Sequence, residues 1–476
     1  MPGTTTTGNR RRNEERTAMV QLEIENQRPR RWNPLFKWRK YLKIFGSVFL
    51  IILACGAVAY ASTAAIWYFF EEHLVTPDNS TTSRPKASSR TVTRATRRPT
   101  TTVSRHSLTS IEPIEESSPY HPIQERPGPF RIVGFYDSWS KYEIRGRQLQ
   151  KLTHVIFSAL DMNSAGTLSF HDYGIRKKFI DLVEMSKRVN PSLKIMFSIA
   201  EYAYASNFEA VVADPEKKKT LCNSIASLIQ THRIDGVDLF WKWPTKVENR
   251  DLFVLLLRDI RQKLNSISDS DHQYILSVVL PNFDWPDFKL SLDLNGIMEQ
   301  VDFINVRTIN YYGFWNSQWG AYTGPPSPLY SGLGAYGDSN VNWTITHYMN
   351  ETGAPGKLNM GVPFFGAHWE NVEGPIGVKE EMWFTAKAKT GEETFEGEYI
   401  PWREMEGWNL SAAKWHQESR CPFIWLPDER KFLGFENQRS LKEKMKYALE
   451  KSLGGITIWS VEMDDDSDTL LNSVQV

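Results

Sequence analysis

The sequence predicts a (β/α)8 TIM barrel with an inserted subdomain, preceded by a single transmembrane helix and a disordered stalk. From about residue 129, short β-type runs alternate with helical patterns. Most of these runs are almost continuously apolar, which is typical of parallel strands covered by helices. Residues 44–70 carry no charged side chain. The expected parts are a cytoplasmic tail (1–43), a transmembrane helix (44–70), a stalk (71–128) and a barrel domain (129–476).

The apolar run at 44–70 is long enough to cross a bilayer as a helix. A cleaved signal peptide has a shorter apolar run at the extreme N-terminus, and a buried core helix is the other alternative. Glu71 and Glu72 follow the run, and the basic residues before it are Arg28, Arg30, Arg31, Lys37, Arg39, Lys40 and Lys43. The positive-inside rule then predicts a single-pass type II membrane protein whose barrel domain is extracellular or lumenal.

The segment after the apolar run is rich in Ser, Thr, Arg and Pro over residues 76–127. Such a composition buries too little apolar surface to fold, which favours a mucin-like stalk. The Asn-X-Ser/Thr sequons all lie on the predicted outer side, at Asn79, Asn342, Asn350 and Asn409. Cys222 and Cys421 either form one disulfide or remain two buried thiols.

The composition limits the classes of partner. Lys plus Arg and Asp plus Glu both number 56, so the net charge gives no reason to expect nucleic acid. Aromatic residues make up 13% of the chain, with 17 Trp, more than a plain core needs. Protein interfaces or the flat C–H faces of sugar rings could use them. No metal or cofactor motif is present.

The barrel strands are expected one by one along the chain. A helix is expected at 215–232, where Pro215 follows Asp214 as at a helix N-terminus. The interval from 364 to about 454 is too long for one helix and predicts the inserted subdomain. The expected strands are 130–136, 153–160, 193–199, 234–240, 274–280, 302–308, 357–363 and 455–461.

The fourth expected strand, IDGVDLFWKWP (234–244), carries an unusual face. Val237, Leu239 and Trp241 share one side, because successive side chains of a strand alternate. Asp238, Phe240 and Lys242 share the other, and Lys242 ends the strand. Ligand sites of such barrels lie at the carboxyl ends of the strands, so this second face is expected to point into the barrel mouth.

This segment resembles the signature D-G-x-D-x-D-W-E-[YW]-P of the family 18 glycoside hydrolases, the chitinases. Asp235, Gly236, Asp238, Trp241 and Pro244 match it. The resemblance covers most of 130–465. It includes GFYDSW in the first strand, SPLY (327–330), GVPFFG (361–366), FLGFEN (432–437) and the terminal GGITIWSVEMDD.

The resemblance implies substrate-assisted hydrolysis, in which the signature Glu protonates the glycosidic oxygen and the preceding Asp orients the substrate's acetamide. Phe240 and Lys242 stand at those two positions. Phenylalanine accepts no hydrogen bond. Lysine is less acidic than glutamate by about six pKa units, or about 8 kcal/mol of driving force for proton transfer.

Other strands depart from the family pattern as well. The sixth-strand M-x-Y-D is replaced by Arg307, Thr308, Ile309 and Asn310, so its Tyr and Asp are lost. The third-strand S-x-G-G ends in Ala200 and Glu201, and an Arg common after G-x-P-x-x-G is Ala367. The sequence therefore predicts a pseudoenzyme of the chitinase family.

The subsite tryptophans of the family correspond to Trp139, Trp315 and Trp459, with Tyr202 where the third-strand loop usually offers Trp. These aromatics either bind sugar or serve packing alone. Lys242 is expected to form an ion pair with Glu201 or to extend its ammonium to water.

The resemblance also suggests roles for the two matching aspartates. In the family, the counterparts of Asp235 and Asp238 belong to the buried network that holds the acid. Without that acid, Asp238 is expected to bond Ser198 or contact Lys242.

Three functions follow. The first is a membrane-tethered, non-hydrolytic protein that binds chitin or another N-acetylglucosamine glycan. The second is an ectodomain that has lost sugar binding and engages a protein partner. The third is a hydrolase with a relocated acid, for which Glu201 is the candidate. The anchor, stalk and degenerate domain together are similar to chitinase-like families of nematodes.

Overall fold

The computed structural model describes residues 128–199, 205–244, 246–270, 272–282, 288–315, 318–332, 337–376, 382–388 and 395–476. The tail, the segment 44–70, the stalk up to residue 127, Asn79, Glu201 and Tyr202 lie outside these described residues. None of the helices within the described ranges has both the length and the apolar character that a bilayer span requires.

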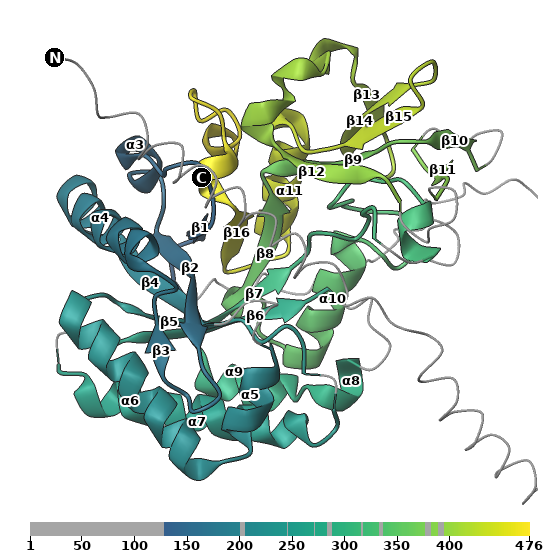
Figure 1. The fold of residues 1–476 in the computed structure, drawn as a ribbon. Coiled ribbons are helices and arrows are strands. Elements are labelled where there is room, and N and C mark those ends of the chain that lie inside the picture. The colour runs from purple at the N-terminus through teal and green to yellow at the C-terminus, as the bar shows by residue number, and fades with distance from the viewer. Residues whose placement is uncertain are drawn as a thin grey trace, which may run out of the picture. The chain divides into compact units, whose positions relative to one another are not determined.

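Eight parallel strands form the predicted barrel (Figure 1). Their spatial order is β1-β16-β8-β7-β6-β5-β4-β2, and the pairing of β1 with β2 closes the ring. The strands are β1 (Arg131–Asp137), β2 (His154–Met162), β4 (Lys194–Ile199), β5 (Gly236–Leu239), β6 (Ile275–Pro281), β7 (Phe303–Arg307), β8 (Leu358–Pro363) and β16 (Gly455–Trp459). A two-residue strand, β3 (Leu168–Ser169), pairs antiparallel with the end of β2.

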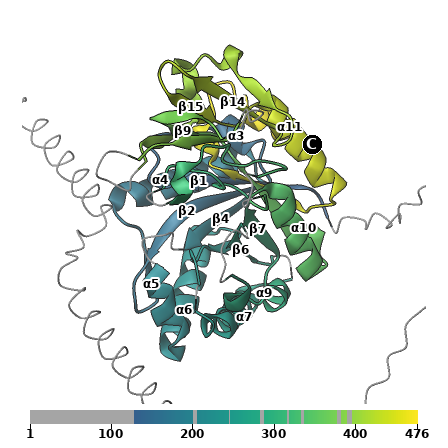
Figure 2. The same ribbon diagram turned by 90° about the vertical axis from the view of Figure 1, so that its right-hand side faces the viewer.

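Helices connect the strands and lie around the barrel (Figures 1 and 2). The α-helices are α3 (Gly146–Leu149), α4 (Tyr173–Val189), α5 (Ala205–Val212), α6 (Pro215–His232), α7 (Asn249–Ile267), α8 (Phe288–Ser291), α9 (Leu294–Gln300), α10 (Val341–Thr352) and α11 (Gln438–Glu450). Helix α6 has the predicted bounds, and the Asp214 carboxylate caps it by accepting the N–H groups of Glu216 and Lys217.

Short 3-10 helices complete the described chain. They are η2 (Gln318–Ala321), η3 (Pro355–Lys357), η4 (Trp402–Gly407), η5 (Leu410–Ala412), η6 (Val461–Met463) and η7 (Leu471–Val474). The last two follow β16, the final barrel strand.

The alternation predicted for β5 is present. Val237 and Trp241 are buried in the layer between strands and helices, and Trp241 stacks on Phe208 of α5 at 5.3 Å. Phe240 lies in a separate apolar cluster inside the barrel. The other members of that inner cluster are Val133, Phe135, Ile156, Met196, Val279 and Phe303.

The inserted subdomain lies between β8 and β16. Its main sheet is antiparallel, in the order β12-β9-β15-β14-β13, and β10 pairs with β11 as a separate ribbon. Helix α11 then leads back to β16. The strands are β9 (Phe365–Trp369), β10 (Val372–Pro375), β11 (Phe384–Ala386), β12 (Gly397–Pro401), β13 (Lys414–His416), β14 (Cys421–Leu426) and β15 (Lys431–Gly434).

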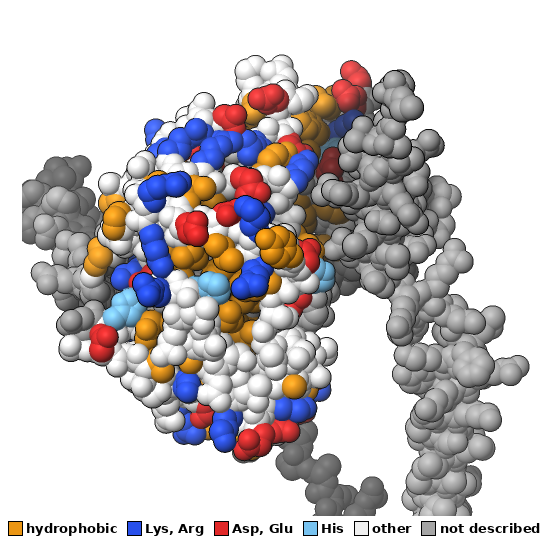
Figure 3. Space-filling model, turned by 60° about the vertical axis from the view of Figure 1, so that its left-hand side comes forward, with side chains coloured by type: hydrophobic (Ala, Val, Ile, Leu, Met, Phe, Trp, Pro, Cys, Tyr) orange, Lys and Arg blue, Asp and Glu red, His pale blue; other side chains and the backbone are white. Residues whose placement is uncertain are grey.

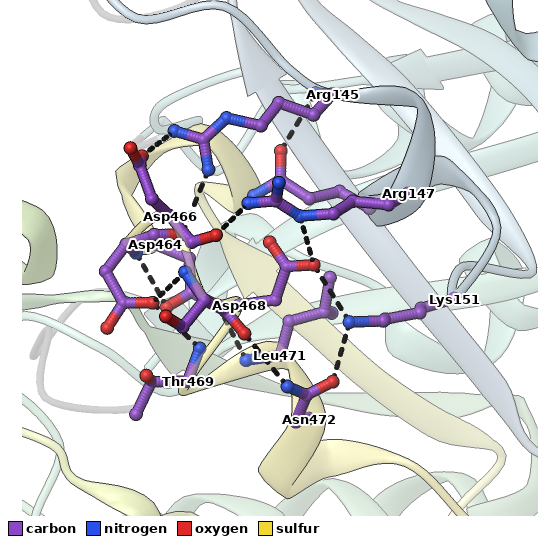
Figure 4. Close-up of polar contacts among 12 residues, drawn as sticks. Arg145, Arg147, Lys151, Asp464, Asp466, Asp468, Thr469, Leu471 and Asn472 are labelled. Carbon is purple, nitrogen blue, oxygen red and sulfur yellow. Dashed lines mark hydrogen bonds and ion pairs between the residues drawn. The ribbon is translucent and has the colours of Figure 1, made fainter.

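A clamp of charged side chains joins the C-terminal segment to the region of α3 (Figure 4). The buried Asp468 carboxylate accepts hydrogen bonds from Arg147 Nε at 2.9 Å and Lys151 Nζ at 2.8 Å. Asp466 pairs with Arg145. These contacts fasten the residues that follow β16 to those that follow β1.

The described residues contain no disulfide. On the face shown in Figure 3, basic and acidic side chains are interspersed. Cys222 on α6 and Cys421 on β14 are both buried free thiols. The disulfide alternative is therefore wrong for this structure, since the two thiols are not joined.

Candidate functional site

Asp238 points into the barrel and is fully buried. Its carboxylate accepts hydrogen bonds from Ser198 Oγ at 3.0 Å, Ser277 Oγ at 2.5 Å and Asn305 Nδ2 at 3.1 Å. Burial raises the pKa of Asp238 to about 6, and the three hydrogen bonds oppose that rise. The expected bond to Ser198 is present, and the carboxylate joins three strands to β5.

Asp235 lies at the opposite end of β5. Its Oδ2 accepts the backbone N–H of Ile195 at 2.8 Å, and its Oδ1 lies 3.2 Å from Lys194 Nζ. Both partners belong to the amino-terminal end of β4. Among the described residues, Asp235 shares none of the hydrogen-bond partners of Asp238 and instead ties β4 to the residue before β5.

Phe240 occupies the position of the acetamide-orienting carboxylate. Its ring is fully buried, 5.5 Å from the ring of Trp459 and 5.6 Å from that of Trp243. Lys242 follows past the strand end and is half-buried. The predicted partner of Lys242, Glu201, lies outside the described residues.

Trp459 and Arg307 fill what remains of the barrel mouth. The Trp459 ring packs on Phe135 at 4.4 Å, and the Arg307 guanidinium lies 5.7 Å from its centroid. The cavity bounded by Asn305, Arg307, Ile309 and Trp459 measures only about 10 Å³. A sugar ring cannot enter a space this small without displacing these side chains.

Ile309 and Asn310 follow Arg307 where the motif has Tyr and Asp. Ile309 is buried, and its carbonyl accepts Asn282 Nδ2 at 3.2 Å. Asn310 is half-buried with a left-handed backbone, at φ 57°. Asparagine tolerates that conformation better than most residues. Neither side chain restores a carboxylate to the barrel mouth.

Glu462 is a buried carboxyl group that the sequence analysis did not single out. Ser460 Oγ donates to its Oε1 at 2.7 Å, and burial raises its pKa to about 8. A protonated glutamate has the chemistry of a general acid. This side chain is only 1% exposed, so it has no open path to a substrate.

A larger hollow lies beside the barrel mouth, against the inserted sheet. It encloses about 690 Å³. Trp315 is half-buried and forms part of its wall, as do Phe314 and Phe395. Its remaining lining residues are His368, Glu370, Glu396, Gly397 and Glu398.

The other predicted aromatic lies elsewhere. Trp139, in the loop after β1, is 49% exposed and meets the ring of His171 edge to face at 4.5 Å. It is not among the described residues that line the hollow at Trp315. Tyr202 lies outside the described residues.

The sequence analysis missed the polar residues of this hollow. The signal lies in two short alternating patterns, His368-Trp369-Glu370 and Glu396-Gly397-Glu398. Alternate residues of a strand share a face. Only the pairing of β9 with β12 brings the two patterns together, and that pairing leaves no mark on the local sequence.

The three described sequons differ in exposure. Asn350, near the end of α10, and Asn409 are exposed. The carbonyl of the Asn409 amide accepts Ser411 Oγ at 2.6 Å. Asn342 is half-buried, and its amide oxygen accepts the Tyr447 hydroxyl at 3.1 Å.

Comparisons with known proteins agree with the fold and the motifs. The chain is 23% identical over 313 residues to Chitinase A1 of Niallia circulans, covering 62% of this chain and 44% of that protein. The chain thus spans less than half the length of that relative.

Two solved structures have similar folds. The Group IV chitinase of Ostrinia furnacalis matches with a TM-score of 0.63 and 22% identity, covering 73% of this chain and 98% of its own. Human YKL-39, described as a pseudo-chitinase with retained chitooligosaccharide binding properties, matches with a TM-score of 0.63 and 20% identity over 73% and 98% of the two chains. The sequence profile of the glycosyl hydrolases family 18 matches residues 131–464, and the chain belongs to that family.

Proposed function

We propose that this protein is a non-hydrolytic member of family 18 that binds a chitooligosaccharide-type glycan at the cell surface. The observation that carries the proposal is the contrast between the two spaces at the barrel mouth. The space bounded by Arg307 and Trp459 measures about 10 Å³, whereas the hollow at Trp315 measures about 690 Å³. Only the second can admit sugar rings.

The loss of hydrolysis is supported at the residues themselves. Phe240 and Lys242 replace the carboxylates that the family uses, and Ile309 and Asn310 remove a further acetamide contact. Asp238 keeps its position, but its carboxylate is occupied by Ser198, Ser277 and Asn305. Loss of a general acid alone typically costs 10² to 10⁴-fold in rate.

The binding half of the proposal rests on aromatic contact. Stacking a sugar ring on Trp315 requires no proton donor, so it can outlast the loss of catalysis. Human YKL-39 is described as a pseudo-chitinase that still binds chitooligosaccharides, which is a precedent within this fold.

The test is a calorimetric titration of the full-length protein with N-acetylglucosamine hexamer. We expect saturable binding that Trp315→Ala weakens at least about tenfold and that Trp139→Ala leaves within about threefold. A flat titration of folded protein would overturn the proposal. Turnover of a chromogenic chitobioside that Glu201→Gln abolishes would overturn its non-hydrolytic half.

A protein-binding ectodomain is the second candidate, and the filled space at Arg307 and Trp459 favours it. If glycan titrations are flat while a partner binds the folded domain, this function replaces the first.

We further propose that residues 44–70 anchor the chain as a type II membrane protein. The basic residues before the run and the acids after it support that orientation. Protease added to intact cells should then release the domain from its stalk and spare residues 1–43. Protection of the domain and loss of the tail would contradict the orientation.

A further inference from the structure

The hollow at Trp315 carries more negative charge than a neutral sugar needs. Glu370, Glu396 and Glu398 all line it. Glu398 is 71% exposed along its side chain and Glu370 is 45% exposed, so both carboxylates remain hydrated and accessible. N-Acetylglucosamine offers these groups only neutral donors.

The antiparallel register explains why the polar side chains gather. Glu398 of β12 is directly opposite His368 of β9, and the backbone N–H of Glu370 donates to the carbonyl of Glu396 at 2.9 Å. Directly opposed residues of two strands share a face. The two alternating patterns therefore form a block of one histidine and three glutamates on one face of the β9–β12 ribbon.

Among the described residues, little positive charge offsets this block. Lys431 lies 4.0 Å from Glu370, at the edge of ion-pair distance, and also 3.5 Å from Glu429. Asn371 donates to Glu396 at 2.6 Å, a neutral contact. Burial lowers the pKa of His368, so its ring adds no charge near neutral pH.

His368 supplies an independent sign of a ligand. Its side chain is 7% exposed, and neither ring nitrogen has a hydrogen-bond partner among the described residues. The nearest carboxylate oxygen, on Glu398, is 4.0 Å from Nδ1. A buried ring nitrogen without a partner is costly, and a ligand N–H or O–H in the hollow would remove that cost.

Aromatic side chains border the hollow from the opposite face of β12. Phe314 packs closely on β12, where a Cβ at Gly397 would lie 2.9 Å from its ring. Trp315 and Phe395 border the same space. Aromatic faces that border the hollow also attract cations, so they suit a ring that bears one. The described residues hold no cluster of His, Cys, Asp and Glu arranged for a metal ion, so an organic cation is the better fit.

The barrel mouth points the same way. At the barrel mouth, the side chains with which the family contacts the substrate's acetamide are replaced by Phe240, Ile309 and Asn310. No contact there favours an N-acetyl group. Binding a free sugar amine requires no acetamide contact. It is protonated in mildly acidic solution, where glutamates are ionised.

We propose that the hollow at Trp315 selects glucosamine-containing, deacetylated chitin over fully acetylated chitin, with Glu398 and Glu370 binding the ammonium groups and Trp315 stacking the rings. This inference rests on the proposed glycan binding and names its ligand class.

The experiment titrates full-length protein in detergent micelles, at about pH 6, with glucosamine hexamer, N-acetylglucosamine hexamer and hexalysine. We expect the glucosamine hexamer to bind at least about tenfold more tightly than the acetylated hexamer. Hydrogen bonds between charged groups are stronger than hydrogen bonds between neutral groups. Higher salt should weaken binding of the glucosamine hexamer and leave binding of the N-acetylglucosamine hexamer unchanged.

Glu398→Gln should lower affinity for the glucosamine hexamer several-fold and lower affinity for the acetylated hexamer by much less. Glu370→Gln is the second variant. Glu216→Gln on α6 is the matched control, since that carboxylate is also exposed but belongs to another element. Circular dichroism checks that each variant is folded.

The outcomes separate this inference from the function on which it rests. If neither hexamer binds, the glycan-binding function fails and the inference with it. If the two hexamers bind equally and Glu398→Gln changes nothing, glycan binding stands and the inference is overturned. If hexalysine binds as tightly as glucosamine hexamer, charge alone is recognised and the amino-sugar assignment is overturned.

Discussion

Phe240 and Lys242 show how far two side chains can change a barrel mouth. Phe240 turns a carboxylate position into apolar core, and its contact with Trp459 closes the space where a sugar would be distorted. The change is therefore one of volume as well as of chemistry. Restoring the acids alone should not restore the site.

We expect the double variant Phe240→Asp/Lys242→Glu to release no chromophore from a chitobioside substrate. Arg307, Ile309 and Asn310 would still occupy part of the space for the sugar and would not contact its acetamide as the family's residues do. The new Asp would sit in the fully buried position of Phe240, so stability should fall by about 3–5 kcal/mol. Measurable turnover in a kinetic assay would show that these two positions alone had disabled the enzyme.

Glu462 should make the domain's stability depend on pH. Its folded pKa, about 8, lies above the ordinary 4.5 because burial disfavours the carboxylate. The contribution of Glu462 to the free energy of unfolding is therefore fully present below about pH 4.5. It is lost as the pH rises through the folded pKa of about 8. The size is about 5 kcal/mol between those limits, by 1.36 kcal/mol per pKa unit.

Denaturant titrations from pH 5 to 9 test this for Glu462→Gln, which is neutral throughout. The variant should lose less stability than the parent across that range. Asp137 and Lys178 are the charged groups facing Glu462, and both remain in the variant. Equal slopes of unfolding free energy against pH for parent and variant would contradict the assignment of this pH dependence to Glu462.

The residues of the candidate site were predicted unevenly. Asp238 and Phe240 were predicted to enter the barrel and they do so, because a period of two fixes which side chains of a strand share a face. His368 and Glu398 were not found, since their meeting depends on the pairing of two strands whose partner residues are 30 positions apart in the sequence.

At the scale of elements, the barrel strands were predictable because each is a buried parallel strand with a continuous apolar run. The expected strand at 302–308 is observed as Phe303–Arg307, and that at 357–363 as Leu358–Pro363. The strands of the insert gave no such signal. They are only three to six residues long, too short for a run of apolar residues or a period of two to stand out.

Lys444 of α11 forms a buried ion pair with Glu436, which precedes the helix, and removing it should be costly. Lys444 Nζ lies 2.7 Å from Glu436 Oε1, and both side chains are almost completely buried. Lys444→Met should destabilise the domain by about 3–5 kcal/mol, because it leaves an unpaired buried carboxylate.

The double variant Lys444→Met/Glu436→Gln removes both charges and should recover most of that loss, as measured by the denaturation midpoint. If the single and double variants are equally unstable, packing of the lysine stem is the cause rather than the charge.

At the scale of the whole domain, the clamp in Figure 4 holds the two ends of the barrel ring together. Asp468→Asn should cost about 1–3 kcal/mol, because the buried carboxylate serves both Arg147 and Lys151. Asp466→Asn is the matched control. Its carboxylate is 82% exposed. The free energy of unfolding, measured by thermal denaturation, should therefore change by less than about 1 kcal/mol.

Glycosylation should follow exposure across the domain. In a secretory-pathway host, glycopeptide mass spectrometry should find Asn350 and Asn409 modified. Asn342 should be unmodified, because its amide bonds Tyr447 and the sequon hydroxyl of Thr344 is fully buried. Modified Asn342 would mean that this region folds after the glycan is attached.

Strand β1 has a mechanical consequence. The chain enters the barrel at Arg131, and β1 is paired in parallel with β16 on one side and β2 on the other. If the domain is tethered through its N-terminus as proposed, a pull on a ligand that the domain holds would travel through this strand. The load would act along β1 and shear both hydrogen-bond ladders at once, so the domain should resist tugging far better than one suspended from an edge strand.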